Sequence, residues 1–412
     1  MSCPHIIKDI HQFVTDKSEL ENLPGDSLNY SVKQLLKNCL DYSLNTDSLI
    51  DPSKLLEIES ILDFLNDELN TGHWSEVPIH IRQYYTLSSF IKCVIIVKNN
   101  RNYSEDVIRK CLKCLDLGLL LGAPLQYNTE LLTDSAKYIR KLLNKCRLKN
   151  EEYCTNNESN DKVTKIEDFQ SLPGKYIDQI ECPSLEYFNK HYFLPQTPVK
   201  LQGCLQHWPA LKKWQDINYL LEIAGDRTVP IEIGSHYVDE NWTQKLMTLK
   251  EFIERHYLSD TGDIGYLAQH NLFEQITELK DDIRIPDYCC LSTDYEHTTE
   301  PDINAWLGPK GTVSPLHHDP KNNLLTQVYG TKQIILFSPE DTPNLYPHDD
   351  KLLNNTAQVD PVNPDLQKHP KFSNAHIYKC LLEPGEMVFI PVKWWHHVTA
   401  IEKSFSVSFW WQ

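Results

Sequence analysis

The fold of the C-terminal half is decided by the segment Ser314-Pro315-Leu316-His317-His318-Asp319-Pro320. Positions i and i+2 of a strand project from the same face, so His317 and Asp319 can both reach one metal ion while His318 points the opposite way. An imidazole and a carboxylate at this spacing supply two corners of the facial triad that holds iron in non-haem oxygenases. A single His-x-Asp occurs by chance in many chains of this length, so a third ligand must come from elsewhere.

A second histidine cluster lies late in the chain, in Ile390-Pro391-Val392-Lys393-Trp394-Trp395-His396-His397-Val398. It follows a Gly-containing turn and a strand that reads as buried, so it can lie beside the first segment. A strand that continues from Val398 would place His396 inward and His397 outward. Spacing by itself leaves both histidines open as the third ligand.

Short strand-like runs separated by turns surround both segments. Turn signals at Gly330 and at Pro384-Gly385 divide them, and the last run alternates small polar with large apolar residues, as a half-buried strand does. Many short strands punctuated by Gly and Pro favour a barrel or double-stranded β-helix over a parallel α/β sheet. The runs are Val229–Ile233, Leu324–Tyr329, Gln333–Phe337, Met387–Ile390 and Ser404–Trp410.

The first 149 residues read differently, because their apolar residues recur at helical spacing. Helices of this length joined by short turns pack as antiparallel neighbours. The stretch 150–165 is polar and reads as a flexible linker. We therefore expect an α+β protein with a helical domain at 1–149, a linker at 150–165 and a catalytic domain at 166–412. The predicted helical segments are 32–44, 55–69, 79–97, 107–121 and 131–148.

The composition narrows the classes of partner. The chain of 412 residues has a formal net charge of −17, which argues against broad nucleic-acid binding. The same charge suits a basic protein partner, although solubility alone also accounts for it. The twelve cysteines are scattered, and Cys111-x-x-Cys114 has no second pair at zinc-ribbon distance. With no apolar run long enough to cross a bilayer and no signal peptide at Met1–His5, we expect a nuclear or cytoplasmic protein of open oligomeric state.

Three segments together resemble the Jumonji-C family of oxygenases: Ser314–Asp319, Ile390–His396 and Phe405–Trp411. The resemblance runs from about residue 165 to the end, and it implies a C-terminal double-stranded β-helix of the cupin type. In that family the first histidine of the Trp-Trp-His segment binds iron. The resemblance therefore implies His396 as the third ligand, beside His317 and Asp319.

The resemblance also implies Fe(II), with 2-oxoglutarate as cosubstrate and dioxygen as oxidant. Lys332 matches the family's lysine that meets the distal carboxylate of 2-oxoglutarate. A lysine in an otherwise apolar strand costs desolvation energy unless it is paired, and a dicarboxylate supplies the partner. Tyr266 matches a hydroxyl donor to the same carboxylate. Further contacts in this pocket are implied for Ser314, Asn323 and Trp410.

Three residues are implied on the substrate side: Glu232, Gln269 and Trp306. An acid and an aromatic plate suit a guanidinium, through charge-assisted hydrogen bonds and stacking. A strand-end glutamate and a core tryptophan would explain the same two residues without any role in binding.

These features are similar to those of arginyl hydroxylases, which act at C3 of arginine residues in other proteins. We therefore expect a protein hydroxylase whose substrate has a basic, Arg- or Lys-rich segment. Histone lysine demethylation and arginine-directed cleavage of histone tails are alternatives that use the same iron site. A binding protein without catalysis is an alternative of another class, and the intact triad and Lys332 argue against it.

Overall fold

The computed structural model of the protein describes residues 3–22, 28–46, 48–100, 104–147, 172–234, 242–258, 264–292, 300–350 and 353–412. The chain forms two compact units. The helical unit comprises 1–158 with 226–228, and the barrel unit comprises 159–225 with 229–412. The predicted linker at 150–165 lies outside the described residues. In the parts of the chain that are described, no helix is long and apolar enough to cross a membrane.

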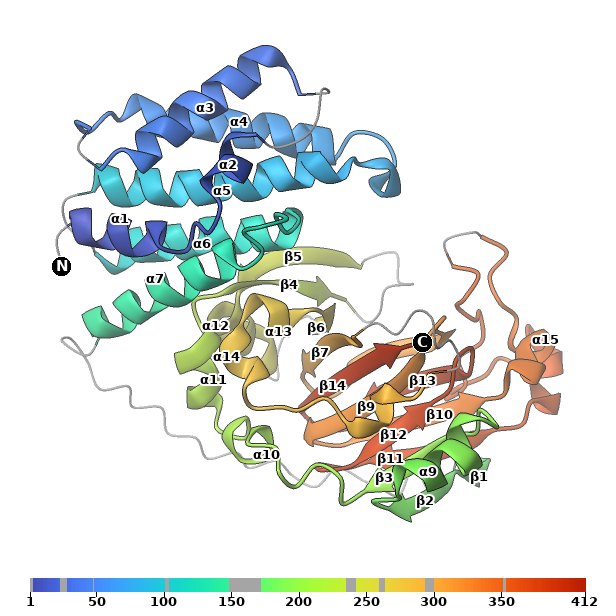
Figure 1. Ribbon diagram of the computed structural model, residues 1–412. Helices are drawn as coiled ribbons and strands as arrows, with labels where there is room; N and C mark the ends of the chain where they lie inside the picture. The colour runs from blue at the N-terminus through green and yellow to red at the C-terminus, as the bar shows by residue number, and fades with distance from the viewer. Residues whose placement is uncertain are drawn as a thin grey trace. The chain divides into compact units, whose positions relative to one another are not determined.

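The helical unit is built around α5, which is buried along nearly its whole length. Polar side chains cap the N-termini of two neighbouring helices: Asn29 accepts from the N–H of Ser31, and Ser104 accepts from the N–H of Val107. The five predicted helices are confirmed, whereas α1 and α2 were not predicted, because short segments carry too few turns to show a stripe. The helices are α1 (Cys3–His11), α2 (Lys17–Glu21), α3 (Tyr30–Leu44), α4 (Ser53–Leu69), η1 (Trp74–Glu76), α5 (Ile79–Asn99), α6 (Glu105–Leu121) and α7 (Leu131–Arg147) (Figure 1).

The barrel unit contains two mainly antiparallel sheets, which confirms the predicted α+β class. The five-stranded sheet has the order β1 (Lys175–Tyr176), β11 (Tyr378–Leu382), β10 (Lys332–Phe337), β13 (Trp395–Ala400) and β8 (Val313–His318). The nine-stranded sheet has the order β2 (Asp178–Glu181), β3 (Val199–Gln202), β12 (Met387–Ile390), β9 (Asn322–Tyr329), β14 (Ser404–Trp411), β7 (Asp302–Gly308), β6 (Gly265–His270), β4 (Thr228–Ile233) and β5 (Thr243–Thr248).

Three apolar clusters fill the layers of this unit. Side chains of both sheets meet in one cluster, with Leu325 and Ile390 from the larger sheet against Ile334 and Val398 from the smaller one. A second cluster, around Phe337, covers the other face of the smaller sheet. The core between the sheets is therefore bounded by β9 and β12 on one side and by β10 and β13 on the other.

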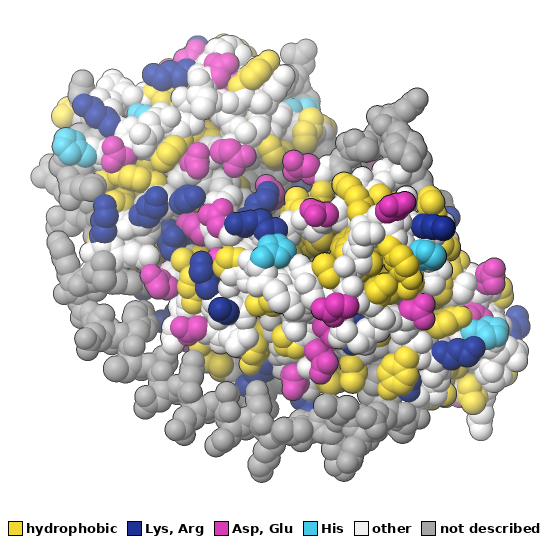
Figure 2. Space-filling view, turned by 60° about the horizontal axis from the view of Figure 1, so that its bottom comes forward, with side chains coloured by type: hydrophobic (Ala, Val, Ile, Leu, Met, Phe, Trp, Pro, Cys, Tyr) yellow, Lys and Arg dark blue, Asp and Glu magenta, His cyan; other side chains and the backbone are white. Residues whose placement is uncertain are grey.

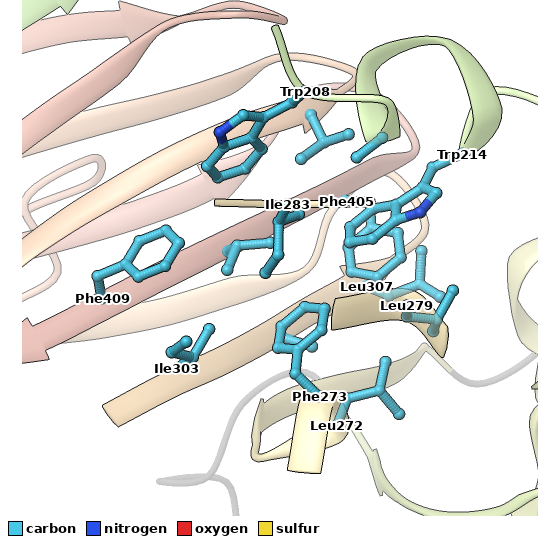
Figure 3. Packing of buried hydrophobic residues seen from close by; sticks show 14 of the residues in the cluster. Trp208, Trp214, Leu272, Phe273, Leu279, Ile283, Ile303, Leu307, Phe405 and Phe409 are labelled. Atoms are coloured by element: carbon cyan, nitrogen blue, oxygen red, sulfur yellow. The ribbon is translucent and has the colours of Figure 1, made fainter. Parts of the chain in front are cut away.

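The largest cluster lies where short helices cover the nine-stranded sheet. Figure 3 shows Trp214 stacked against Phe405 of β14, with ring centroids 4.4 Å apart, and Trp208 edge-on to Phe409. These aromatic rings hold β14 in place from its outer face. The covering and connecting turns are α9 (Leu185–Phe188), η2 (Asn189–Phe193), α10 (Ala210–Lys213), α11 (Ile217–Ala224), α12 (Leu249–Phe252), η3 (Ile253–Tyr257), α13 (Leu272–Gln275), α14 (Thr277–Lys280), η4 (Asp287–Cys290), η5 (Pro339–Asp341), α15 (Thr342–Leu345) and η6 (Pro370–Asn374).

Candidate active site

Two antiparallel neighbours, β8 and β13, carry the two histidines of the predicted triad. His317 on β8 is the register partner of His396 on β13, so both side chains leave the sheet on the same face. Their ring centroids are 4.2 Å apart. Asp319, directly after β8, is buried beside them. His318 instead packs against the indole of Trp395, at 4.7 Å between centroids.

The three side chains of the triad converge on one point. Asp319 Oδ1 lies 3.9 Å from His317 Nε2, and Asp319 Oδ2 lies 3.5 Å from His396 Nε2. One ligand atom from each residue lies within 4.8 Å of the other two, and no other such group occurs in the described chain. Two imidazoles and a carboxylate on one side of an ion form a facial triad and leave other coordination positions open.

Each histidine of the triad is oriented by its own strand. His317 Nδ1 donates to the carbonyl of Pro315 at 2.7 Å, and His396 Nδ1 donates to the carbonyl of Trp394 at 3.0 Å. We assign the protons to Nδ1 because a carbonyl can only accept, and this leaves each Nε2 with a lone pair for a metal. Burial lowers the pKa of His396 to about 4, so its imidazole is neutral at physiological pH.

A β-bulge lets Ser314 and His317 face the same cavity. Strand alternation sends side chains three residues apart to opposite faces. Here His396 pairs with His317 and Val398 pairs with Ser314, so β8 has one residue more than β13 over this step. The extra residue lies at Pro315 or beside it. Because proline has no backbone N–H, Pro315 loses no hydrogen bond between the strands at the bulge.

Lys332 begins β10, which also pairs with β13. It lies opposite Ala400, four residues along from His396, or about 13 Å at the usual rise of a strand. Its side chain is 2% exposed, and its ammonium donates to the hydroxyl of Tyr266 at 3.1 Å. Burial lowers the pKa of Lys332 to about 7, and the described residues place no carboxylate beside it. Such a buried cation favours the binding of an anion.

The turn before Lys332 depends on Gly330. Its φ of +69° lies in the left-handed region, and a Cβ there would lie 1.9 Å from the carbonyl oxygen of Lys403. This glycine therefore allows β9 to turn directly into β10, and it fixes where the lysine enters the barrel.

Tyr266 on β6 supplies the hydroxyl that Lys332 meets. Burial raises its pKa, so it stays a neutral hydrogen-bonding group, and the side chain of Ser314 is a second partner. Its ring centroid lies 6.1 Å from that of Trp306, whose Nε1 donates to Ser408 Oγ at 2.9 Å.

One cavity joins the triad to Lys332. Its wall contains every residue that we predicted for the metal or the cosubstrate, together with Trp306. Three lining atoms are buried without a hydrogen-bond partner among the described residues: Asp319 Oδ2, Asn323 Oδ1 and Trp410 Nε1. Buried polar atoms are nearly always paired, so these atoms mark the place of a polar ligand. The lining residues are Tyr266, Trp306, Ser314, His317, Asp319, Asn323, Leu325, Lys332, Ile390, His396, Val398 and Trp410.

The lining fits both groups that the resemblance implies, Fe(II) and 2-oxoglutarate. Neutral imidazole and carboxylate ligands suit iron, and the buried ammonium at the other end suits the free carboxylate of a dicarboxylic acid. Between the two ends lie Leu325, Ile390 and Val398, an apolar wall for the methylene carbons of such an acid. We did not predict this wall, although the apolar runs of β9 and β12 contained the signal.

Of the three residues predicted for the substrate side, one lines the cavity and another lies beside Tyr266. Glu232 on β4 is the register partner of Tyr266, is half-buried, and accepts from Trp242 Nε1 at 3.3 Å. Burial raises its pKa. Trp306 lines the cavity, whereas Glu232 and Gln269 do not, and Gln269 is exposed with a φ of +45°. Trp242 was missed because a lone tryptophan outside a strand pattern gives no signal.

Comparisons with known proteins agree with this geometry. Residues 184–412 match the model of the cupin-like domain family. Lysine-specific demethylase 8 of Danio rerio is 43% identical over 362 residues, covering 85% of this chain and 86% of the relative. Lysine-specific demethylase 8 of Xenopus tropicalis is 40% identical over 395 residues, covering 86% and 87%. Jumonji C domain-containing protein 5 of Drosophila melanogaster is 39% identical over 406 residues, covering 96% of both chains.

Proposed function

Since this chain belongs to the Jumonji-C family of cupin-like proteins, we propose that it is an Fe(II)- and 2-oxoglutarate-dependent oxygenase that hydroxylates arginine residues of protein substrates. The observation that carries the proposal is that one cavity is lined both by three side chains that could hold a metal ion and by the buried Lys332, which has no carboxylate beside it among the described residues. The triad alone would not indicate this activity, because many cupins carry the histidines. Lys332 alone would not indicate it either.

The residues of the chain would divide the work as follows. His317, Asp319 and His396 would hold iron, which supplies activation of dioxygen when 2-oxoglutarate is bound. Lys332 and Tyr266 would bind the distal carboxylate, with Ser314, Asn323 and Trp410 as further polar contacts. The apolar wall would exclude water from the reacting end of the cavity.

The arginine preference rests on Glu232 and Trp306. Glu232 is a half-buried carboxylate on the strand beside Tyr266, and it accepts a hydrogen bond from the uncharged indole of Trp242. A guanidinium could add charge-assisted hydrogen bonds there and stack on the ring of Trp306. The net charge of −17 gives less support, because Figure 2 shows acidic side chains spread among basic ones on the face of the molecule that it draws. We propose a basic protein segment as partner, in the nucleus or cytoplasm.

Lysine demethylation is the second candidate, favoured by the names of the relatives from Danio rerio and Xenopus tropicalis. It would use the same cavity, since hydroxylation of an N-methyl carbon releases that carbon as formaldehyde. The two candidates differ only in which side chain is presented to the metal.

The test is mass spectrometry on Arg-rich peptides, with and without Nε-methyl-lysine, after incubation with Fe(II), 2-oxoglutarate and air. We expect the gain of one oxygen on an unmodified arginine, and none with His317→Ala. Glu232→Gln should lose peptide oxidation but keep conversion of 2-oxoglutarate to succinate. Glu340→Gln, an exposed acid of the same unit, is the matched control and should behave as the wild type.

Loss of methyl from lysine without oxygen gain would make the chain a demethylase and remove the role given to Glu232. Failure of both reactions, together with unchanged 2-oxoglutarate turnover in His317→Ala, would contradict the oxygenase proposal itself.

A further inference from the structure

A groove of the barrel unit that shares no lining residue with the triad cavity contains two cysteines. Cys182 directly follows β2, and Cys204 lies two residues beyond β3, its parallel neighbour. The N–H of Cys182 and the thiol of Cys204 both donate to the carbonyl of Gln202, at 2.8 and 3.3 Å. The fold therefore brings the backbone of Cys182 and the thiol of Cys204 to one carbonyl oxygen.

The two thiols are also neighbours of each other and of Tyr288. The hydroxyl oxygen of Tyr288 lies 3.7 Å from Cys204 Sγ and donates to the carbonyl of Pro183 at 2.6 Å. Burial raises the pKa of the Cys204 thiol to about 12, and the thiol of Cys182, within hydrogen-bonding reach, adds to that rise. The Cys204 thiol is therefore protonated and half-buried, and it lies beside the exposed thiol of Cys182.

Cys182 is the thiol that a solute meets first. It is exposed, whereas Cys204 is half-buried. Its φ of +30°, directly before Pro183, lies where residues other than glycine are rarely found. Strained backbone of this kind persists only where the surrounding structure imposes it, here through the bond to Gln202 and the anchoring of Pro183 by Tyr288.

The rim of the groove around these thiols offers hydrogen-bond donors to an anion. His207 and Arg284 are exposed, whereas Lys280 is partly exposed and paired with Glu274 at 2.7 Å. Asp287 is the one acidic residue among the described lining side chains. The guanidinium of Arg284 can therefore form charge-assisted hydrogen bonds to a carboxylate of a small solute.

We propose that Cys182 and Cys204 form a site of reversible oxidation that takes a small anionic disulfide as co-reactant. The sulfur of Cys182 attacks one sulfur of that disulfide, whose S–S bond breaks, and the departing thiolate takes up the proton that Cys182 loses. The sulfur of Cys204 then attacks Cys182 in the mixed disulfide, the S–S bond to the small molecule breaks, and the departing thiolate takes up the proton that Cys204 loses. Two protein thiols are oxidised to one disulfide, and one external disulfide is reduced to two thiols.

A second cysteine pair serves as an internal comparison. Cys111 Sγ donates to the carbonyl of Cys93 at 3.9 Å, but both residues are buried in the helical unit. The two thiols lie within hydrogen-bonding reach of each other in both pairs, but between the two pairs only Cys182 is exposed to solution. An oxidant should distinguish the two pairs while the protein stays folded.

The test uses the full chain with oxidised glutathione as the probe, followed by alkylation and non-reducing tryptic mapping. Cleavage after Lys190 and Lys200 puts the two cysteines on separate peptides. We expect those peptides joined, with the loss of two free thiols per chain and full recovery by dithiothreitol. In Cys204→Ser the product should stop at glutathione on Cys182, and in Cys182→Ser neither product should form.

The control is Cys290→Ser, which removes another exposed thiol and should leave the linkage unchanged. Cys204→Ala replaces Cys204→Ser if the serine variant does not fold. The proposal is overturned if Cys182 and Cys204 stay fully alkylated when Cys290 already carries glutathione, or if the joined peptides contain other cysteines.

Discussion

Lys98 in the helical unit and Lys332 in the barrel unit are both buried, and they differ in what surrounds the charge. In the helical unit, Lys98 donates to the carbonyls of Tyr42 and Asn45 and to the hydroxyl of Ser48, and its ammonium lies 4.0 Å from the ring centroid of Tyr42. In the barrel unit, Lys332 donates to a single tyrosine hydroxyl. The exposed fractions are similar, 5% and 2%.

We expect this difference to separate a structural cation, Lys98, from one that binds a ligand, Lys332. Lys98 ties the end of α3 to α5 with acceptors that the chain itself supplies, so its charge stabilises the fold. Lys332 lacks such acceptors, and its pKa is lowered to about 7 because burial disfavours the ammonium. Burial alone therefore does not identify a functional lysine, whereas the number of acceptors around it does.

The largest expected effect is on cosubstrate affinity. Lys332→Met should weaken 2-oxoglutarate binding by about 100-fold, since a hydrogen bond to a charged group contributes about 1.5–3 kcal/mol. The free energy of unfolding of the ligand-free protein should stay the same or rise, because a buried charge has been removed. Calorimetry with Mn(II)-loaded protein measures the first, and urea unfolding measures the second. A clear loss of stability in Lys332→Met, with unchanged affinity for 2-oxoglutarate, would instead make Lys332 a structural lysine like Lys98.

Lys98→Met should give the opposite pattern. It leaves buried carbonyls without a donor, so we expect the helical unit to lose about 3 kcal/mol in its free energy of unfolding. Affinity for 2-oxoglutarate should not change. Urea unfolding followed by circular dichroism provides the first value, and the calorimetric assay above provides the second.

The pH dependence sharpens the same comparison. Binding of a dianion requires the ammonium form of Lys332, which is half populated near pH 7 in the free protein, so 2-oxoglutarate affinity should fall by up to about tenfold per pH unit above 7. The free energy of unfolding has the opposite pH dependence. Between pH 7 and the ordinary lysine pKa the unfolded chain binds more protons than the folded chain, so the ligand-free barrel gains stability as pH rises. Proton uptake on binding at pH 8, measured in two buffers, should be absent in Lys332→Met.

A smaller effect is expected from Trp410→Phe. The indole N–H of Trp410 has no described partner and faces the cavity, so its loss should weaken 2-oxoglutarate binding by about fivefold, the value of one neutral hydrogen bond. Trp411→Phe is the matched control, because that indole already donates to the carbonyl of Leu291 at 2.7 Å. Equal effects of the two changes would remove Trp410 from the set of cosubstrate contacts.

Local pattern accounts for much of the fold but for less of the cavity. Helical stripes and alternating runs locate α3 to α7 and the strands β4, β9, β10, β12 and β14, because each pattern is a local property. His317 and Asp319 could also be paired by strand alternation. The choice of His396 needed the family resemblance, since its facing of His317 depends on the register between two strands far apart in sequence.

Ser314 marks the limit of reasoning from alternation. Alternation places it opposite His317, and only the bulge brings both to one wall. Likewise, only the structure shows that Asn323 Oδ1 and Trp410 Nε1 are buried without a hydrogen-bond partner among the described residues. Periodicity therefore predicts elements, whereas pairing between strands determines the contents of the cavity.

The bulge beside Pro315 also has a consequence for insertions and deletions. Removing one residue between Ser314 and His317 would leave them two apart, so regular alternation would keep both side chains on one face and opposite the same residues of β13. A designer who transplants this triad to another barrel can therefore replace the bulge with a regular step, provided that the serine stands two residues before the histidine. In alignments of related chains, a one-residue gap at this point is compatible with the same cosubstrate pocket.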